Sequence, residues 1–451
     1  MTDEIGPTRK IAEFIHRTTF KEIPPAASEG AKLQILDTIG IGLAALDQPV
    51  ARAIQEYVRS LGGGAVATVM GMDGYKTSPP LAALANGCLF NMLDLDDHTA
   101  TFVLPTVLAI GEMLNAPGER VLEAYILAAE ATTRMDHTIV GRSTDFGGPT
   151  VRGLYHVTLS GPIGAALAAS KLLGLNLAQT QGAMGTASVS SGGVRRNRAT
   201  KSKSMSAGNA ASFGISAALL ARQGVTGVSD ILEGRAGLVD AVCLPGESDW
   251  VPIMEHLGNP FQLATSVGMG RYPAIGTIGG MIETLEQLRR SSGLDGAEVV
   301  RVEARLTPHS VTAMSDTAAG VSHYPENGLA AEGSWSYAMA ATLLDGSFTI
   351  DHITDASVQN PRFRDLASKI ELIPLKAWSE PESVTVHLRD GRSVTARLTR
   401  SRHRPQQEDF VAKFRDCAGR HLAGAEVEEL YQKIMDMENL GAIGELTAAF
   451  G

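Results

Sequence analysis

Four short segments of this 451-residue chain carry side chains that could do chemistry. The first, Leu-Asp-Leu-Asp-Asp-His-Thr at residues 93–99, places the carboxylates of Asp94, Asp96 and Asp97 and the imidazole of His98 within five positions. Crowded carboxylates raise one another's pKa values, so this segment suits acid–base catalysis. Two alternatives stay open: a polar turn at the end of an apolar helix, and a site for a hard cation, although one short segment gives no octahedral ligand set.

The second segment is Tyr-His-Val-Thr at residues 155–158. It precedes Ser160, Gly161 and Pro162, which predict the start of a helix. At a helix entrance, His156 could carry protons near neutral pH, and the alternative is a histidine with a purely structural role. The pair Asp136-His137 is interpreted as ordinary helix surface.

The third segment is a basic run with five cations in nine positions of an otherwise acidic chain. The cations are Arg195, Arg196, Arg198, Lys201 and Lys203. Such cations, together with the free N–H groups of a helix predicted to begin near Gly208, would attract a small carboxylate or phosphate. A solvated basic loop is the alternative. No aromatic residue interleaves with the run, which argues against a nucleic-acid partner.

The fourth segment is Arg271-Tyr272-Pro273, with Pro308-His309 and His323-Tyr324 further along the chain. These side chains could face a cleft between two domains. They could equally be turn and surface residues of the smaller domain.

The elements that must position these residues change in kind near residue 265. Before it, apolar and small residues recur at helical spacing in one segment after another, for example in 31–46, 78–93 and 208–224. After it, 301–306 and 383–388 alternate like strands, the second continuing through Arg-Asp-Gly-Arg into a hairpin, and 333–346 reads as a helix. The prediction is a mainly α protein: a helical domain (1–265), a smaller α+β lid domain (266–400) and C-terminal helices that return to the helical domain (401–451).

Composition narrows the class of protein further. With 39 basic and 49 acidic residues, the net charge of −10 disfavours binding to nucleic acid. The three cysteines are far apart and form no C-x-x-C pair, so neither a disulfide framework nor a cysteine metal site is expected. No signal peptide or membrane span is visible. We therefore expect a cytoplasmic protein without metal or membrane partner.

The order of these segments resembles the MmgE/PrpD family, which includes 2-methylcitrate dehydratase, cis-aconitate decarboxylase and iminodisuccinate epimerase. The resemblance covers nearly the whole chain. It is carried by ILDTIGIGLAAL, LANGCLFNMLDLDDHT, GLYHVTLSGPIGAALAASKLLGL, SKSMSAGNAASFGISAALLARQGVTG, GRYPAIGTIGG, WSYAMAATLLDG and VTVHLRDGRSVTARL. It implies an all-helical domain with an α+β lid, a homodimer, and an active site between the domains that uses no cofactor.

The resemblance also implies site residues. Asp94, His156 and Lys203 match the family's catalytic aspartate, histidine and lysine. We expect His98, Arg195, Arg196, Lys201, Arg271 and Tyr272 to contact the substrate. Like charge from the neighbouring arginines is expected to lower the pKa of Lys203 and favour a neutral base.

Several family histidines are absent. His98 stands where a threonine is usual, Gly279 and Ser206 replace expected histidines, and the usual His-Pro-Ser after the aspartates is missing. Fewer proton donors favour a single proton transfer next to a carboxylate or carbonyl of a small organic acid. The sequence predicts a cofactor-independent lyase or isomerase, ranked first as a divergent isomerase, epimerase or cyclase of a specialised pathway. The alternatives are an orthodox 2-methylcitrate dehydratase or cis-aconitate decarboxylase, and a non-catalytic ligand-binding member.

Overall fold

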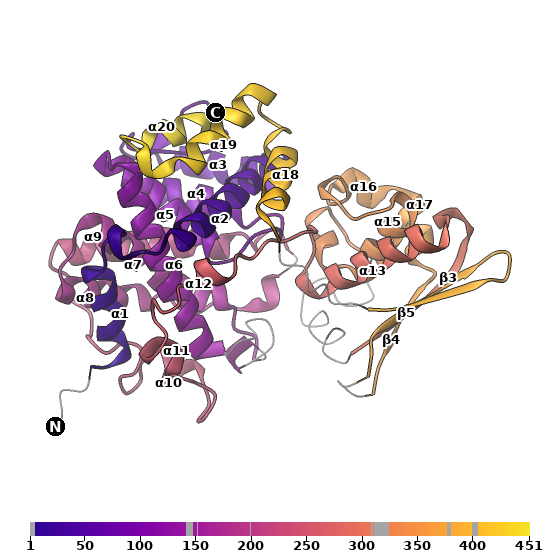
Figure 1. Cartoon of the computed structure of the whole chain (residues 1–451), viewed down its shortest axis with the longest axis horizontal. Coiled ribbons are helices and arrows are strands. Elements are labelled where there is room, and N and C mark those ends of the chain that lie inside the picture. The colour runs from indigo at the N-terminus through magenta and orange to yellow at the C-terminus, as the bar shows by residue number, and fades with distance from the viewer. Residues whose placement is uncertain are drawn as a thin grey trace.

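Two domains of unequal size lie side by side in the computed structural model of the chain (Figure 1). The structure describes residues 5–140, 148–150, 152–198, 200–307, 310, 324–376, 380–398 and 405–451. The protein is mainly α, with a large helical domain and a smaller α+β domain, as predicted.

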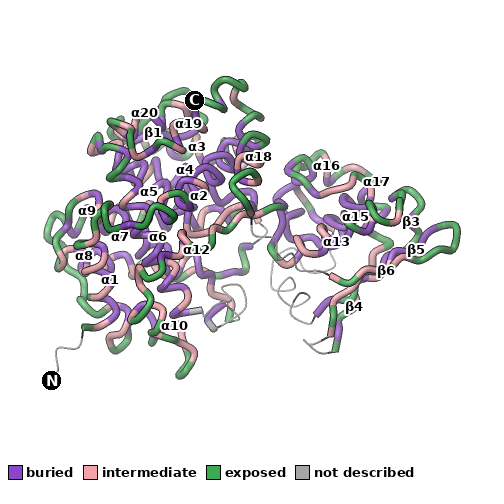
Figure 2. Tube along the Cα trace, viewed as in Figure 1, coloured by how far each residue is buried: buried purple, intermediate pink, exposed green. Residues whose placement is uncertain are grey.

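The large domain is built from helices and one short two-stranded ribbon. The N-terminal elements are α1 (Pro7–Arg17), α2 (Pro25–Ala44), α3 (Pro49–Leu61), β1 (Ala67–Thr68), β2 (Lys76–Thr77), α4 (Pro79–Phe90) and α5 (Ala100–Leu114). They are followed by α6 (Gly118–Val140), α7 (His156–Leu173), α8 (Leu177–Ser188), α9 (Met205–Arg222), α10 (Leu238–Val242), α11 (Val251–Met254) and α12 (Gln262–Thr265). Buried residues run through the middle of this domain (Figure 2), and α2 and α4 are apolar on nearly every face. Helices of that kind belong inside a core.

Small residues bring α4 and α9 into close contact, and this contact positions the site. A Cβ added at Gly87 of α4 would lie 3.0 Å from the Cα of Gly208 in α9. One at Gly208 would lie 2.4 Å from a backbone oxygen of α4. The loop carrying Asp94 follows α4 and Lys203 precedes α9. Close packing of the two helices therefore brings these two charged residues together.

The helix α7 begins earlier than the sequence predicted. It starts at His156 and contains Pro162 in its interior, whereas Ser160 was the expected start. Proline has no N–H, so the carbonyl of Thr158, four residues earlier, loses its helical partner. The N–H of Gly192 donates to that carbonyl instead, at 2.9 Å. This bond ties the loop before the basic run to the helix that carries His156.

The small domain packs helices against a four-stranded sheet. Its elements are α13 (Gly276–Ser292), β3 (Val299–Leu306), α15 (Trp335–Asp345), α16 (Asp355–Gln359), α17 (Pro361–Ala367), β4 (Ile370–Pro374), β5 (Ser383–Leu388) and β6 (Ser393–Arg397). The strand order is β4-β3-β5-β6, with β3 and β4 parallel and the other pairs antiparallel. The predicted strand, hairpin and helix are confirmed as β3, β5–β6 and α15. The strand β4 was not predicted from the sequence.

The chain then returns to the large domain through α18 (Gln407–Ala418), α19 (Gly424–Met435) and α20 (Gly444–Thr447). These helices lie on the large domain at the yellow end of the chain in Figure 1. Gly40 of α2 faces the ring of Phe414, where an added Cβ would lie 3.2 Å from that ring. Lys413 forms an ion pair with the buried Asp37 of α2 at 2.8 Å. The C-terminal helices thus cover the central helix of the large domain.

Candidate active site

A cavity of about 760 Å³ lies between the two domains. The large domain contributes the loop after α4, the end of α6, the start of α7 and Arg198, and the small domain contributes α13 and the segment before it. The polar residues lining it include Asp94, Asp96, Asp97, His98, Asp136, His137, His156, Arg198, Arg271 and Tyr272. Clefts between domains that gather polar and titratable groups are common catalytic sites.

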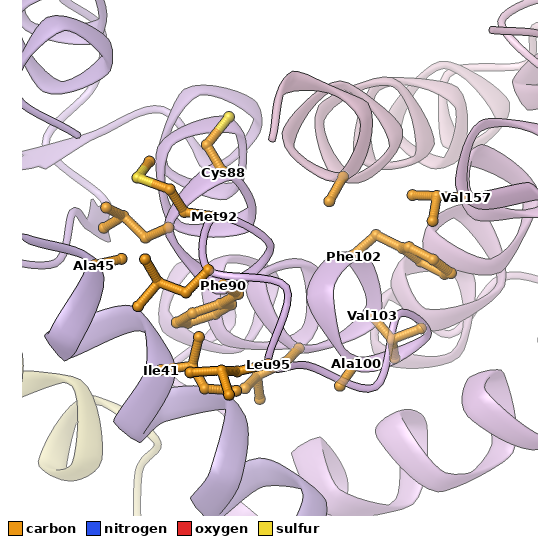
Figure 3. Close-up of a cluster of buried hydrophobic side chains, with 14 of the residues drawn as sticks. Ile41, Ala45, Cys88, Phe90, Met92, Leu95, Ala100, Phe102, Val103 and Val157 are labelled. Atoms are coloured by element: carbon orange, nitrogen blue, oxygen red, sulfur yellow. The ribbon is translucent and has the colours of Figure 1, made fainter. Parts of the chain in front are cut away.

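The loop that presents Asp94 is held by apolar neighbours. Leu93 and Leu95 are buried on either side of it, and Leu95 lies in the cluster with Phe90, Ala100 and Phe102 (Figure 3). The backbone of Asp94 is left-handed, with a φ of 52°. Aspartate tolerates this conformation better than most residues. Anchored apolar residues on both sides therefore fix the direction of one charged side chain.

Asp94, Lys203 and Glu332 form a buried charged cluster. The ammonium of Lys203 donates to Oδ1 of Asp94 at 2.6 Å and lies 3.4 Å from Oε2 of Glu332. The three side chains are 4%, 3% and 2% exposed. Because Glu332 lies in the turn before α15, this cluster joins the two domains.

Burial and ion pairing set the protonation states of this cluster. Burial opposes ionisation of Asp94, but the combined attraction of Lys203, Arg198 and His98 outweighs it and holds its pKa well below the usual value. Burial would lower the pKa of Lys203, but Asp94 and Glu332 raise it above its ordinary value. Burial raises the pKa of Glu332 to about 8, against the opposing effect of Lys203. At neutral pH the cluster therefore holds a charged Lys203–Asp94 pair beside a largely protonated Glu332.

The expectation of a neutral Lys203 base is therefore wrong. That expectation was based on the cations near Lys203 in the sequence. In the structure, the groups closest to Lys203 are the carboxylates of Asp94 and Glu332. Lys203 is not among the residues that line the cavity, while Asp94 is. Oδ2 of Asp94 has no hydrogen-bond partner among the described residues. Lys203 thus holds a carboxylate that keeps one acceptor atom open.

Two histidines face the cavity next to this carboxylate. Nδ1 of His98 lies 2.7 Å from Oδ2 of Asp96, whose side chain is fully buried and also accepts from Asn91. In a neutral His98, a proton on Nδ1 held by Asp96 leaves the lone pair on Nε2. The ring of His156 lies 5.1 Å from that of His98, centroid to centroid. The arrangement can move a proton at the cavity wall.

Asp136 is not on a helix surface, contrary to the sequence interpretation. It is 7% exposed and lines the cavity, as does the neighbouring His137. Burial raises the pKa of Asp136 to about 7, against the opposing effects of the nearby Ser160 and His98. The signal was present in α6, where apolar residues from Leu122 to Ala131 occupy every face of the helix. A polar residue late in such a helix faces protein or a cavity rather than water.

The basic run does not assemble into one anion site. Arg196 and Lys201 are exposed, and Arg195 is buried with Nη1 3.4 Å from the carbonyl of Thr150. None of the three lines the cavity, whereas Arg198 does. The helix after the run starts at Met205 rather than near Gly208. Side chains adjacent in a loop point in different directions, so sequence clustering overstated the local positive charge.

The wall from the small domain contains Arg271 and Tyr272. The guanidinium of Arg271 lies 3.7 Å from Glu283 and 3.6 Å from Glu286, and 5.3 Å from the centroid of the Tyr272 ring. The hydroxyl of Tyr272 donates to Glu286 at 3.0 Å. Both residues line the cavity between the domains, as in the first of the two alternatives predicted for them. Of the other residues named with them, Pro308, His309 and His323 lie outside the described residues.

No individual role was predicted for Asp96, and Glu332 was not identified from the sequence. Asp96 was named within its cluster, but only the 2.7 Å contact separates it from Asp97 as the partner of His98. Glu332 stands alone among alanine and glycine residues and offers no local pattern. In the part of the chain that the structure describes, no group of three or more His, Cys, Asp or Glu side chains is arranged to hold a metal ion. None of the helices described there is long and apolar enough to cross a membrane.

Comparison with known proteins places this geometry in context. The model of the MmgE/PrpD N-terminal domain matches residues 9–250, and that of the C-terminal domain matches residues 272–437. Cis-aconitate decarboxylase from Homo sapiens is 27% identical, covering 98% of this chain and 93% of that protein. The enzyme of that name from Aspergillus terreus is 24% identical over 98% and 95%. The mitochondrial 2-methylcitrate dehydratase from Yarrowia lipolytica is 25% identical over 97% and 89%.

Proposed function

Because this chain belongs to the MmgE/PrpD family, we propose that it is a cofactor-independent lyase that moves a proton next to a carboxylate or carbonyl of a small organic acid. The observation that carries the proposal is the pair of histidines on the cavity wall, one of them held by a buried aspartate. The similar proteins named above are a decarboxylase and a dehydratase, which supports lyase chemistry.

His98 is the proposed proton carrier. Asp96 accepts from its Nδ1, which orients the ring and stabilises the imidazolium formed when Nε2 takes a proton. In a dehydration, His98 removes the C–H proton, the electron pair forms an enediolate, and the hydroxyl leaves with a proton from an acid. In a decarboxylation, the C–C bond breaks, carbon dioxide leaves, and the remaining carbanion takes a proton. Both steps require a proton carrier within about 3 Å of the reacting atom.

Fixed charge supports the anionic intermediate. Arg198 lines the cavity and can bind a carboxylate or enediolate oxygen. Lys203 does not line the cavity and acts through Asp94, whose carboxylate it binds. Asp94 keeps one buried oxygen without a hydrogen-bond partner among the described residues, and that oxygen can accept from a protonated neighbour.

The spacing of the two rings favours a lyase over an epimerase that uses His98 and His156 as its two bases. Such an epimerase places a base on each face of one carbon, with each base about 3 Å from that carbon. Ring centroids 5.1 Å apart are typical of rings in contact with each other rather than of rings on opposite sides of a bound carbon. Proton transfer by the pair on one face suits elimination or decarboxylation.

A second candidate is an isomerase that returns the proton on the same face. Among the described lysines and arginines, Arg198 and Arg271 alone line the cavity, and Arg271 already pairs with two glutamates. A substrate with fewer carboxylates than citrate matches that supply of positive charge.

The test incubates the purified protein in D₂O with a panel of small acids that includes cis-aconitate and 2-methylcitrate. NMR reports deuterium incorporation and new products, and released carbon dioxide is measured in parallel. Loss of carbon dioxide identifies a decarboxylase, a conjugated acid identifies a dehydratase, and a shifted double bond identifies an isomerase.

Two variants and one control test whether His98 and Asp96 take part in the reaction. We expect His98→Gln and Asp96→Asn to lower the rate by about 10²–10⁴, the usual contribution of general acid–base catalysis. His387→Gln on β5, where the ring contacts Ser393, serves as the control and should keep the rate. The absence of exchange, product and carbon dioxide with every acid would refute the proposed function, and full activity in both site variants would refute the assignment of His98.

A further inference from the structure

A buried carboxyl group faces the cavity and has no part in the steps proposed above. Asp136 lies near the end of α6, on a different element from either histidine. Its Oδ1 is buried and has no hydrogen-bond partner among the described residues. A carboxyl group that is buried without full hydrogen bonding costs free energy, so its position on a cavity wall calls for a functional reason.

The groups around Asp136 come from three elements. Ser160 of α7 is near enough to Asp136 to lower its pKa, although the serine hydroxyl donates to the carbonyl of His156, one turn earlier, at 3.4 Å. Two residues of the loop after α4 also affect the pKa of Asp136: His98 lowers it and Asp97 raises it. On its own helix, His137 lines the same cavity. Asp136 therefore lies within electrostatic reach of the proposed proton carrier.

The protonation state of Asp136 suits an acid. Burial disfavours the carboxylate of Asp136 more than the nearby His98 and Ser160 favour it. Its pKa of about 7 leaves the protonated form well populated at neutral pH. A protonated carboxyl carries one O–H, which it can donate. General acids in enzymes are tuned to such values by burial.

We propose that Asp136 is a further catalytic residue of this cavity, the acid that gives a proton to the substrate atom whose bond is broken. The proton leaves the carboxyl O–H, the electron pair stays on Asp136 as a carboxylate, and the new bond forms at the leaving oxygen or at the carbanion. Asp136 then regains a proton from His98 or water. This inference rests on the proposed function and assigns the donor that its lyase steps require.

The variant Asp136→Asn tests the inference. Asparagine has nearly the same shape as aspartate, but it does not titrate. With the acid that proves active in the panel, the wild-type rate should fall as the pH rises through about 7, because the protonated donor is lost. Asp136→Asn should be about 10²–10⁴-fold slower at pH 6 and should lack that fall. Glu119→Gln, at the exposed start of the same helix, is the matched control and should behave as wild type.

A second readout needs no substrate. A carboxyl whose pKa is higher in the folded state stabilises the fold less and less as the pH rises from its unfolded value near 4 to about 7. The melting temperature of the wild type should therefore fall more between pH 5 and pH 8 than that of Asp136→Asn, with Glu119→Gln following the wild type.

The outcomes separate the two proposals. An active wild type with an equally active Asp136→Asn and an unchanged pH profile overturns the inference and leaves the proposed function standing. The inference is also overturned if the melting temperatures of the wild type and Asp136→Asn change equally between pH 5 and pH 8. Asp136 would then hold no proton at neutral pH. A wild type inactive with every acid overturns the proposed function and the inference that rests on it.

Discussion

Replacing Lys203 with methionine removes the one cation of the buried cluster while keeping most of the volume of the side chain. In the folded wild type, Nζ lies 2.6 Å from Oδ1 of Asp94 and 3.4 Å from Oε2 of Glu332, and all three side chains are at most 4% exposed. Removing one partner of a buried ion pair leaves an uncompensated charge, which costs about 3–5 kcal/mol. Since Glu332, with a pKa of about 8, is largely protonated at pH 7, one carboxylate is left unpaired. We therefore expect Lys203→Met to lose about 3 kcal/mol at that pH, the lower end of the range.

The loss of stability should depend on pH with a definite sign. The folded-state pKa of Asp94 is depressed in the wild type, so its contribution is present above the unfolded value near 4 and is lost as the pH falls. Without Lys203 that pKa rises, so the variant gains relative stability as the pH falls and Asp94 takes up a proton. The difference between variant and wild type should therefore be smaller at pH 5 than at pH 8.

Urea denaturation followed by circular dichroism measures this effect. Lys201→Met, an exposed lysine two residues away, is the matched control and should stay within about 0.5 kcal/mol of the wild type. The double variant Asp94→Asn with Lys203→Met removes the stranded charge and should recover most of the loss. A Lys203→Met protein as stable as the control, or a double variant no more stable than the single one, would refute the account of the cluster.

Three further outcomes follow from the packing and protonation described above. Gly214→Ala should destabilise the protein by about 1–3 kcal/mol, because the added Cβ would lie 2.4 Å from the Cβ of Ala165. Gly280→Ala, which has open space around the added Cβ, should stabilise the protein by about 0.5–1 kcal/mol. Equal melting temperatures for the two variants would contradict this prediction. A thiol reagent should modify Cys243 alone in the native protein, since Cys88 and Cys417 are buried and Cys243 is only half-buried, and native labelling that persists in Cys243→Ser would contradict it. Glu332→Gln should flatten the loss of melting temperature between pH 5 and pH 8, since a pKa raised to about 8 makes stability fall as the pH rises; an unchanged slope would argue against a protonated Glu332.

Local patterns predicted the elements whose residues repeat with a clear period. The alternation in β5 and β6 and the glycine after α15 were sufficient, because each reports the backbone within a few residues. The strand β4 has weak alternation, and its position depends on a parallel partner far away in the sequence. The start of α7 was misplaced because proline normally begins a helix, and only the contact with the loop near Gly192 makes it tolerable inside one.

The site was predicted in part, and the reason lies in sequence distance. Asp94, His156 and Lys203 were identified by the resemblance to a family rather than by spacing. The charge of Lys203 was predicted wrongly because Glu332 and Asp94 come from remote segments, and distance in space controls electrostatic interaction. Asp136 was misread because one residue pair does not reveal that its helix is surrounded by protein.

The covering of α2 by α18 means that the genetic order and the spatial order of this protein differ. The helices that complete the large domain are translated after the whole small domain has been made. During synthesis, the face of α2 that α18 covers therefore stays exposed until the small domain and α18 have been translated. Burial of that face, together with the Lys413–Asp37 ion pair, is therefore completed only after the small domain has been translated.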